Sequence, residues 1–392
     1  MIPLLIRLLG SVIALVLTAC SSSPLRGTGD LGLIVERAQG RVVVVDSSAR
    51  TLLGRIDGLG DLSHASVVFS RDGRYGYVFG RDGGLSKVDL LTQQVVKRVL
   101  QAGNSIGGAI SQDGRLVVAQ NYQPGGIKAF DAETLALVAE VPASYGDGSK
   151  RSKVVGLADL THHRFAYSLF DGGEIRITDF SDPQAPQTQS FPAGQQPYDG
   201  LVTPDGRYYL AGLFGEDGLT LVDTWQPERG SQPILQHYGR GQEKLPVFKM
   251  PHLRGWAIAG HRAYLPAVGH HELLVVDTTT WQEVGRIPLK GQPVFAIARP
   301  DGRQVWINFA FPDNGFVQVL DTLTGQITAT LAPGKAVLHL EFTPRGEAVW
   351  ISARDDNRVV VYDTTSLEPI QTLTVDNPSG IFFTHRAGRQ GF

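Results

Sequence analysis

The chain has 392 residues, with 36 Lys and Arg against 38 Asp and Glu, a formal net charge of −2 and 42% hydrophobic residues. This hydrophobic content is enough for a packed core and excludes an intrinsically disordered chain. The sequence shows neither a basic stripe nor a cluster of aromatic and basic residues, so we expect no nucleic acid among the partners.

The first predicted element is an N-terminal export signal. A positive charge precedes an apolar run over residues 8–17, which is too short to span a membrane and leads into Leu17-Thr18-Ala19-Cys20. This tetrapeptide resembles a bacterial lipobox, which implies a lipoprotein signal peptide over residues 1–19 and a lipid anchor on the sulfur of Cys20. An ordinary signal peptide with an incidental cysteine is the alternative. Because Ser21 rather than Asp follows, we expect a periplasmic protein anchored preferentially to the outer membrane.

Residues 20–30 are predicted to form a lipidated flexible tether, since small and polar residues dominate them. Cys20 is the single cysteine of the chain, so its lipidation leaves no thiol for a disulfide or a thiolate metal site. The folded domain is therefore expected to occupy residues 31–392.

An internal repeat runs through this domain. An apolar strand that ends in Asp, mostly followed by Thr or Ser, occurs eight times at spacings of 42 to 54 residues, with closing residues Asp46, Asp89, Asp131, Asp179, Asp223, Asp277, Asp321 and Asp363. A unit of this length matches one four-stranded blade of a β-propeller. Asp-Gly-Arg turns precede several copies, and the glycine supplies the positive φ of a tight hairpin. The closing Asp is expected to accept hydrogen bonds from the amides of the following turn. The sequence thus predicts an all-β, eight-bladed β-propeller.

The first and last repeats are incomplete in complementary ways. Each full unit is expected to run from an inner strand A through strands B and C to an outer strand D. Residues 31–36 match a B strand at the start of the domain, and residues 379–384 match a lone A strand at its end. Three N-terminal strands and one C-terminal strand are therefore expected to form a composite blade, which closes the ring without an open sheet edge.

Ligands are expected at the mouth of the central channel, where the D-to-A and B-to-C connections emerge. His64 and His252 occupy equivalent positions at the start of an A strand, and neutral imidazole is a good ligand for iron or zinc. The small residues around His64 leave room for a bulky ligand. A structural histidine is the alternative at both positions.

Three arginines are predicted to share one side of this mouth. Arg37, Arg81 and Arg354 lie eight or nine residues before the closing Asp of neighbouring units. Guanidinium groups on adjacent loops can bind carboxylates in a bidentate manner, whereas solvated loop arginines are the alternative. Arg151 and Arg254, in D-to-A segments, are candidates to extend this set.

Three residues are candidates for proton transfer: Asp147 in an insertion over residues 144–152, and Tyr198 and Asp199 at the head of an A strand. A carboxylate near a bound ligand acts as a general base when burial raises its pKa, and a solvated carboxylate is the alternative. Asp159 ends its A strand away from the mouth and ranks below them. The sequence contains no HExxH, GxSxG or phosphate-binding loop motif.

Ser63-His64-Ala65-Ser66-Val67, followed by RDGRYGYVFGRDGGLSKVDL, resembles the heme d1 domain of cytochrome cd1 nitrite reductase. PYDGLVTPDGRYYL and PHLRGW are also in register with that domain, so the resemblance covers most of the mature chain. No CxxCH heme c motif is present, and a lipobox-bearing propeller without heme c is similar to the NirF-type heme d1 biosynthesis proteins. The resemblance implies that His64 is the axial ligand of the iron. It also implies that Arg81 contacts the carboxylates of heme d1 or of an iron-containing precursor.

The same resemblance implies a place in the final steps of heme d1 biosynthesis for dissimilatory nitrite reductase. Nitrite reductase and a late heme d1 dehydrogenase are the protein partners that it implies. Nitrite reduction itself is disfavoured, because Tyr198 stands where the reductase carries a distal histidine. The acidic residue that the family requires is carried over to Asp147.

The sequence leaves open whether the chain modifies a tetrapyrrole side chain or only carries the pigment. Two rival classes also remain. One is a non-heme structural or interaction propeller at the outer membrane. The other is a calcium-dependent propeller enzyme such as a lactonase, against which the scarcity of Asp, Glu and Asn in the A strands argues.

Overall fold

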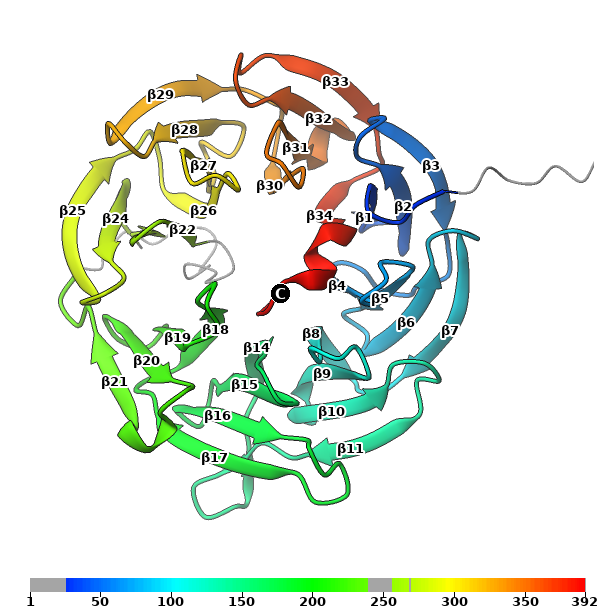
Figure 1. Cartoon of the computed structure of the whole chain (residues 1–392), viewed down its shortest axis with the longest axis vertical. Coiled ribbons are helices and arrows are strands. Elements are labelled where there is room, and N and C mark those ends of the chain that lie inside the picture. The colour runs from blue at the N-terminus through cyan, green and yellow to red at the C-terminus, as the bar shows by residue number, and fades with distance from the viewer. Residues whose placement is uncertain (1–25, 239–255, 268, 392) are drawn as a thin grey trace, which may run out of the picture.

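The computed structural model describes residues 26–238, 256–267 and 269–391. Eight four-stranded antiparallel sheets stand around a central channel (Figure 1). Each sheet is one blade, which confirms the predicted eight-bladed β-propeller. Helical structure in the described ranges is limited to short 3-10 segments, among them η1 (Pro227–Arg229), η3 (Arg354–Asp356) and η4 (Thr384–Gly388). No helix in these ranges has the length and apolar character that a membrane span requires.

In seven blades, consecutive strands run from the channel outward. Blade 2 consists of β4 (Ser66–Phe69), β5 (Tyr75–Phe79), β6 (Gly84–Asp89) and β7 (Gln94–Leu100), and blade 3 of β8 (Asn104–Ile110), β9 (Leu116–Gln123), β10 (Gly126–Asp131) and β11 (Leu137–Val141). Blade 4 consists of β14 (Val154–Asp159), β15 (Arg164–Leu169), β16 (Glu174–Asp179) and β17 (Gln187–Pro192), and blade 5 of β18 (Pro197–Val202), β19 (Tyr208–Leu213), β20 (Leu219–Asp223) and β21 (Ser231–Ile234).

The second half of the ring repeats this order. Blade 6 consists of β22 (Ala257–Ala259), β23 (Arg262–Pro266), β24 (Glu272–Asp277) and β25 (Gln282–Pro288), and blade 7 of β26 (Pro293–Ala298), β27 (Gln304–Phe309), β28 (Val317–Asp321) and β29 (Gln326–Leu331). Blade 8 consists of β30 (Val337–Phe342), β31 (Ala348–Ala353), β32 (Arg358–Asp363) and β33 (Pro369–Thr374).

Blade 1 joins the two ends of the fold. It consists of β34 (Pro378–Phe383) on the channel side, then β1 (Leu31–Glu36), β2 (Arg41–Asp46) and β3 (Thr51–Ile56). The pairing of β1 with β34 is antiparallel and places Gly32 opposite Phe383. Residues 26–30, predicted as part of the tether, contact the propeller, because Arg26 forms an ion pair with Asp46 at 3.0 Å and the Thr28 hydroxyl donates to the Asp72 carbonyl at 2.6 Å.

Local turn chemistry explains why each repeat forms a blade. In all eight units the closing Asp accepts backbone N–H bonds from the turn that follows, as predicted. The glycines of the Asp-Gly-Arg turns adopt positive φ, 67° at Gly73 and 72° at Gly302. Each unit therefore carries its own hairpin signals and does not depend on distant residues for its turns.

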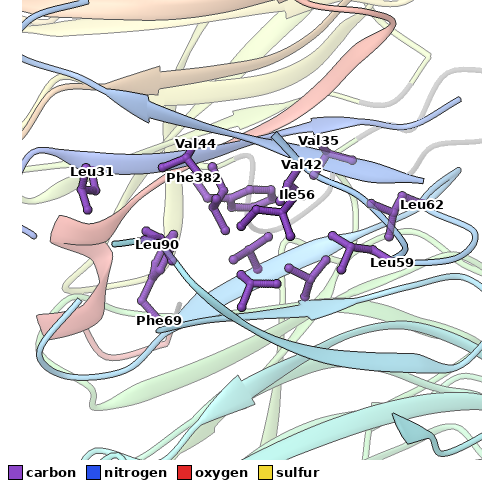
Figure 2. Close-up of a cluster of buried hydrophobic side chains, with 14 of the residues drawn as sticks. Leu31, Val35, Val42, Val44, Ile56, Leu59, Leu62, Phe69, Leu90 and Phe382 are labelled. Atoms are coloured by element: carbon purple, nitrogen blue, oxygen red, sulfur yellow. The ribbon is translucent and has the colours of Figure 1, made fainter. Parts of the chain in front are cut away.

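The core lies between neighbouring blades. Figure 2 shows the cluster between blades 1 and 2, where Val42 and Val44 of β2 and Phe382 of β34 pack with Phe69 and Leu90 of blade 2. All five are at most 7% exposed. Full burial of such a side chain is worth about 1.5–3 kcal/mol, so these clusters hold the blades, and the loops at their ends, in fixed relative positions.

Residues 384–391, the C-terminal strap, follow β34 and turn toward the centre of the ring (Figure 1). The Arg386 guanidinium donates two hydrogen bonds to Glu341 of β30. Arg71, in the A-to-B turn of blade 2, donates to the Ala387 carbonyl. Asp159, at the end of β14, accepts the Gly391 N–H at 3.0 Å. The strap therefore crosses the channel at the end that carries the A-to-B turns, opposite the predicted mouth.

Candidate functional site

The channel contains a cavity of about 1680 Å³ that extends from the mouth to the C-terminal strap. Its lining includes His64 and the three predicted arginines at the mouth, His339 on the wall and Arg389 on the strap. Ordinary small-molecule sites are ~300–1000 Å³. The cavity therefore has the volume to hold a bulky ligand.

His64 lies in the connection between β3 and β4, and its side chain is exposed and lines the cavity. The Asp61 carboxylate accepts the Ser63 N–H at 2.8 Å, and the Asp61 carbonyl accepts the Arg81 N–H at 2.7 Å. From the other side, the Arg37 guanidinium donates to the Ser63 carbonyl. Blades 1 and 2 thus both hold this connection, which fixes the backbone that carries the imidazole.

Arg354, Arg37 and Arg81, which we call the arginine arc, lie on the neighbouring blades 8, 1 and 2 and all line the cavity. The structure thus brings together the three arginines that the sequence groups. Burial first, and the positive charge of Arg354 second, lower the pKa of the Arg37 guanidinium. Two cations held this close favour a ligand that brings negative charge.

Asp355 and Asp61 neutralise part of this positive charge. Neither carboxylate is predicted from the sequence as part of the site. Arg354 donates two hydrogen bonds to Asp355, at 2.6 and 3.1 Å, and this pairing lowers the pKa of the Asp355 carboxyl. Hydrogen bonds from Ser63, and then the charges of Arg81 and Arg37, lower the pKa of Asp61. Three guanidinium groups therefore face two ionised carboxylates, which leaves a net positive charge for an anionic ligand.

An aromatic cluster lies beside the arginine arc, and we call its members Tyr122, Phe170, Tyr198 and Phe214 the aromatic wall. Tyr122 and Tyr198 line the cavity, and the two phenylalanines pack behind Tyr198. The Arg81 guanidinium lies over the Tyr122 ring at 5.8 Å, and the Tyr122 and Tyr198 hydroxyls are 3.3 Å apart. The Tyr198 ring contacts Phe170 and Phe214 at centroid distances of 5.9 and 6.4 Å. Flat aromatic faces beside cations suit a flat, anionic ligand.

Sequence reasoning found Tyr198 but missed the other three aromatic residues. A signal for them exists, because Tyr122, Phe170 and Phe214 each lie nine residues before the closing Asp of their unit. Arg37 and Arg354 occupy the same repeat position. Reading this one position around the ring yields two of the three arginines and three of the four aromatic residues, and Arg81 lies one residue later in its unit.

The structure does not bring Asp147 and Arg151 to the mouth. Both lie in an exposed hairpin of β12 (Ser144–Tyr145) and β13 (Lys150–Arg151), and neither lines the cavity. Arg176 of β16 donates to the Ser144 carbonyl at 2.6 Å, so the hairpin is held on the third strand of blade 4, away from the channel wall. Asp147 accepts bonds from the Ser149 hydroxyl at 2.6 Å and amide at 3.0 Å, which lower its pKa.

Four further predicted residues are not placed by the structure. Cys20, His252 and Arg254 lie outside the described residues. Asp199 belongs to β18, next to Tyr198, but its side chain lies outside the described part of the chain.

The far end of the cavity carries a second set of ionisable groups. His339 of β30 lines the channel, and its Nδ1 accepts the Ile381 N–H at 3.2 Å, which leaves the ring proton on Nε2. Burial lowers the pKa of His339 to about 3 and that of His385 to about 3. Burial also raises the pKa of Asp159 to about 6, although Arg71 lies nearby. Both imidazoles are therefore neutral at pH 7.

Comparison with known proteins gives consistent findings. Residues 26–387 match the family described as the cytochrome D1 heme domain. The Protein NirF of Stutzerimonas stutzeri is 57% identical over 377 residues, which cover 96% of each chain. The Protein NirF of Pseudomonas aeruginosa is 57% identical over 389 residues, 98% of this chain and 99% of that one. The solved structure of the dihydro-heme d1 dehydrogenase NirN in complex with DHE matches with a TM-score of 0.79 and 26% identity, over 93% of this chain and 77% of that one.

Proposed function

The chain belongs to the cytochrome D1 heme domain family and, within it, to the NirF-type proteins, and from this premise we propose that it binds heme d1 or an iron-containing precursor at the channel mouth. In this proposal it acts in the final steps of heme d1 biosynthesis for dissimilatory nitrite reductase. The observation that carries the proposal is an exposed imidazole beside the arginine arc on the rim of one large cavity. This combination suits a macrocycle with a central iron and carboxylates on its periphery, because imidazole is a common iron ligand and guanidinium groups bind carboxylates.

Each part of the mouth has one task in this proposal. His64 would provide a nitrogen ligand to the iron, and the hydrogen bonds that hold its loop would limit where the iron can lie. The arginine arc binds the carboxylates and so sets the rotation of the ring in its plane. Tyr122 and Tyr198, the two members of the aromatic wall that line the cavity, would pack against the apolar part of the macrocycle. The tetrapyrrole would bring the iron itself, and among the described residues no group of three His, Cys, Asp or Glu side chains is arranged to hold a metal ion.

The charge state of the mouth favours holding the pigment over modifying its side chains. Arg354 keeps Asp355 ionised, and Ser63 and two arginines keep Asp61 ionised, so neither carboxyl is a ready proton donor at neutral pH. Tyr198 and Tyr122 offer hydroxyl groups that can donate hydrogen bonds at the mouth. The chain's own residues thus orient the ligand and donate hydrogen bonds to it.

We also propose that a lipid on Cys20 anchors the protein on the periplasmic side of the membrane, preferentially the outer one. There it would meet nitrite reductase and a late heme d1 dehydrogenase, the partners to which the pigment passes. Replacement of Cys20 by Ser should shift the protein from the membrane fraction to the soluble periplasmic fraction. A protein that stays in the membrane fraction after this change contradicts the anchor without touching the pigment site.

Titration of the purified protein with heme d1 tests the pigment site. The wild type should shift the visible absorption bands with a 1:1 end point, and His64→Ala should lose the shift that iron ligation causes. The variant should still bind metal-free pigment through the arginine arc. His162→Asn, at an exposed turn with φ of 59° on the other face, is the matched control and should behave like the wild type. An unchanged spectrum in the wild type, or a full shift in His64→Ala, overturns the proposal.

A further inference from the structure

Phe311 is an exposed aromatic side chain on the rim of the cavity. It is 64% exposed and lines the cavity together with His64 and the arginine arc. Ten large hydrophobic side chains are exposed in the part of the chain that the structure describes, and Phe311 alone among these ten lines the cavity. Apolar surface in water is unfavourable, and at the edge of a binding site it marks a place that a ligand covers.

The loop that carries Phe311 is held in place on both sides. Residues 310–316 connect β27 with β28, and the Ala310 N–H donates to the Gln292 carbonyl at 2.9 Å. The Asn314 carbonyl accepts the Val337 N–H of blade 8 at 2.8 Å. These bonds tie the loop to the entry of its own blade and to the inner strand of the next one. The exposure of Phe311 is therefore a feature of a fixed loop and not of a frayed one.

The position of Phe311 in the ring relates it to the arginine arc. Phe311 belongs to blade 7, next to Arg354 on blade 8, while Tyr122 belongs to blade 3, next to Arg81 on blade 2. The arc is thus flanked by one aromatic side chain on each side. Arg81 already covers the Tyr122 ring at 5.8 Å, whereas the Phe311 ring is mostly in water. A flat ligand whose carboxylates reach the arc brings its apolar edges to these two flanks.

We propose that Phe311 is a positioning residue that packs against the macrocycle of the bound tetrapyrrole and slows its release. The inference rests on the proposed pigment site and adds a contact that depends on the apolar ring system, and not on iron or carboxylates. Phe311 should therefore contribute equally to the binding of iron-loaded and metal-free pigment. It should leave the coordination of the iron unchanged, because His64 and its loop belong to blades 1 and 2.

The test compares Phe311→Ala with the wild type by titration and by stopped-flow release, using heme d1 and metal-free heme d1. Phe311→Ala should raise the Kd of both ligands about tenfold, equivalent to about 1.4 kcal/mol, through faster release. The visible spectrum at saturation should match that of the wild type. Phe311→Trp, which keeps an aromatic ring at this position, should bind both ligands with Kd values close to those of the wild type. His64→Ala should show the opposite pattern, with a loss confined to the iron-loaded ligand and a changed spectrum.

Leu323→Ala is the matched control, because Leu323 is 72% exposed on the turn after β28 and does not line the cavity. It should leave both Kd values unchanged, and neither alanine variant should lower the thermal midpoint, since both side chains are exposed. A Kd within twofold of the wild type in Phe311→Ala overturns the inference. If the wild type itself binds neither ligand, the proposed function fails first.

Discussion

The two ends of the channel carry similar residue types, histidine, arginine and acidic residues, but differ in how these are exposed and paired. At the mouth, His64 is exposed, and the arginine arc carries more positive charge than its two carboxylates neutralise. At the opposite end of the channel, which we call the floor, Asp159 is fully buried and His385 is half-buried, and Arg386 of the C-terminal strap is paired with Glu341. The mouth is therefore built to gain a partner, whereas the charged pair and the Asp159 carboxyl at the floor already have partners within the chain, although the His385 Nδ1 has none among the described residues.

Because of this difference, we expect the mouth to determine ligand binding and the floor to contribute to the stability of the fold. Ionisable groups at the mouth cost little in the free protein because water and counter-charges reach them. Groups at the floor are desolvated, and their internal partners offset this only in part, because burial still shifts the pKa values of Asp159, His339 and His385 toward the neutral forms. Changes at the mouth should thus alter ligand binding with little effect on unfolding, and changes at the floor should do the reverse.

The largest expected effect comes from breaking the pair between Arg386 and Glu341. Glu341 is 4% exposed, so Glu341→Ala leaves a guanidinium without its carboxylate at the floor and should lower the free energy of unfolding by about 3 kcal/mol. Glu283→Ala removes a similar two-bond partner from Arg286 on an outer strand and should cost under about 1 kcal/mol. Chemical denaturation measures both. If both variants lost the same free energy of unfolding, the burial of the Arg386–Glu341 pair would not matter for stability, which contradicts the prediction.

The second effect is a pH dependence that originates at Asp159. Its pKa rises from an ordinary 3.8 to about 6 on folding, so the folded state holds the proton more tightly than the unfolded state. The proton on Asp159 therefore contributes to the free energy of unfolding below pH 4. This contribution, on the order of 3 kcal/mol, is lost as pH rises through 6.

The two half-buried histidines, His339 and His385, act in the opposite direction over this range, because their folded pKa values of about 3 lie below the ordinary 6.5. The comparison is therefore between wild type and Asp159→Asn, measured by denaturation from pH 4 to pH 7. The stability difference between the two proteins should change by that amount in favour of the variant as pH rises. A difference that does not depend on pH contradicts the shifted pKa.

A third, smaller effect concerns the arginine arc. Arg81→Gln removes one guanidinium from the mouth and should raise the Kd for heme d1 about tenfold, with a weaker dependence on salt. Arg151→Gln is the control, since Arg151 is exposed on the β12–β13 hairpin and does not line the cavity. Both variants should unfold like the wild type. If Arg151→Gln weakens binding as much as Arg81→Gln, the hairpin contributes to the site after all.

The smallest effect is expected from the tyrosine pair. Tyr198→Phe removes the hydroxyl that lies 3.3 Å from that of Tyr122 and should change the Kd for the pigment two- to threefold, the scale of one neutral hydrogen bond. Asp147→Asn should change nothing in the same titration, because the structure places Asp147 on an exposed turn outside the cavity. A larger effect from Asp147→Asn than from Tyr198→Phe would restore the sequence-based assignment of Asp147.

The fold was predictable because its signals are local and repeated. Each closing Asp and each Asp-Gly turn acts within a few residues, so eight copies indicate eight blades without knowledge of their packing. Arg37, Arg81 and Arg354 were predictable for the same reason, since equal repeat positions on neighbouring blades become neighbours in space.

The rest depends on contacts that leave no local pattern. Asp159 and Gly391 are joined by a hydrogen bond, yet more than half of the chain separates them. Asp147 was assigned to the mouth from its D-to-A segment, but an insertion can extend in any direction, and contact with Arg176 directs this one away from the channel. Phe311 is held exposed by its loop, in which Ala310 bonds to Gln292 and Asn314 bonds to Val337. These contacts cannot be seen in the sequence.

A crystal structure of the protein loaded with heme d1 tests the central claim most directly. We expect the iron to lie at the mouth with the His64 imidazole as its axial ligand. The carboxylates should contact Arg37, Arg81 and Arg354, and the C-terminal strap should keep its position. Iron bound by another side chain, or pigment bound outside the channel, would contradict it.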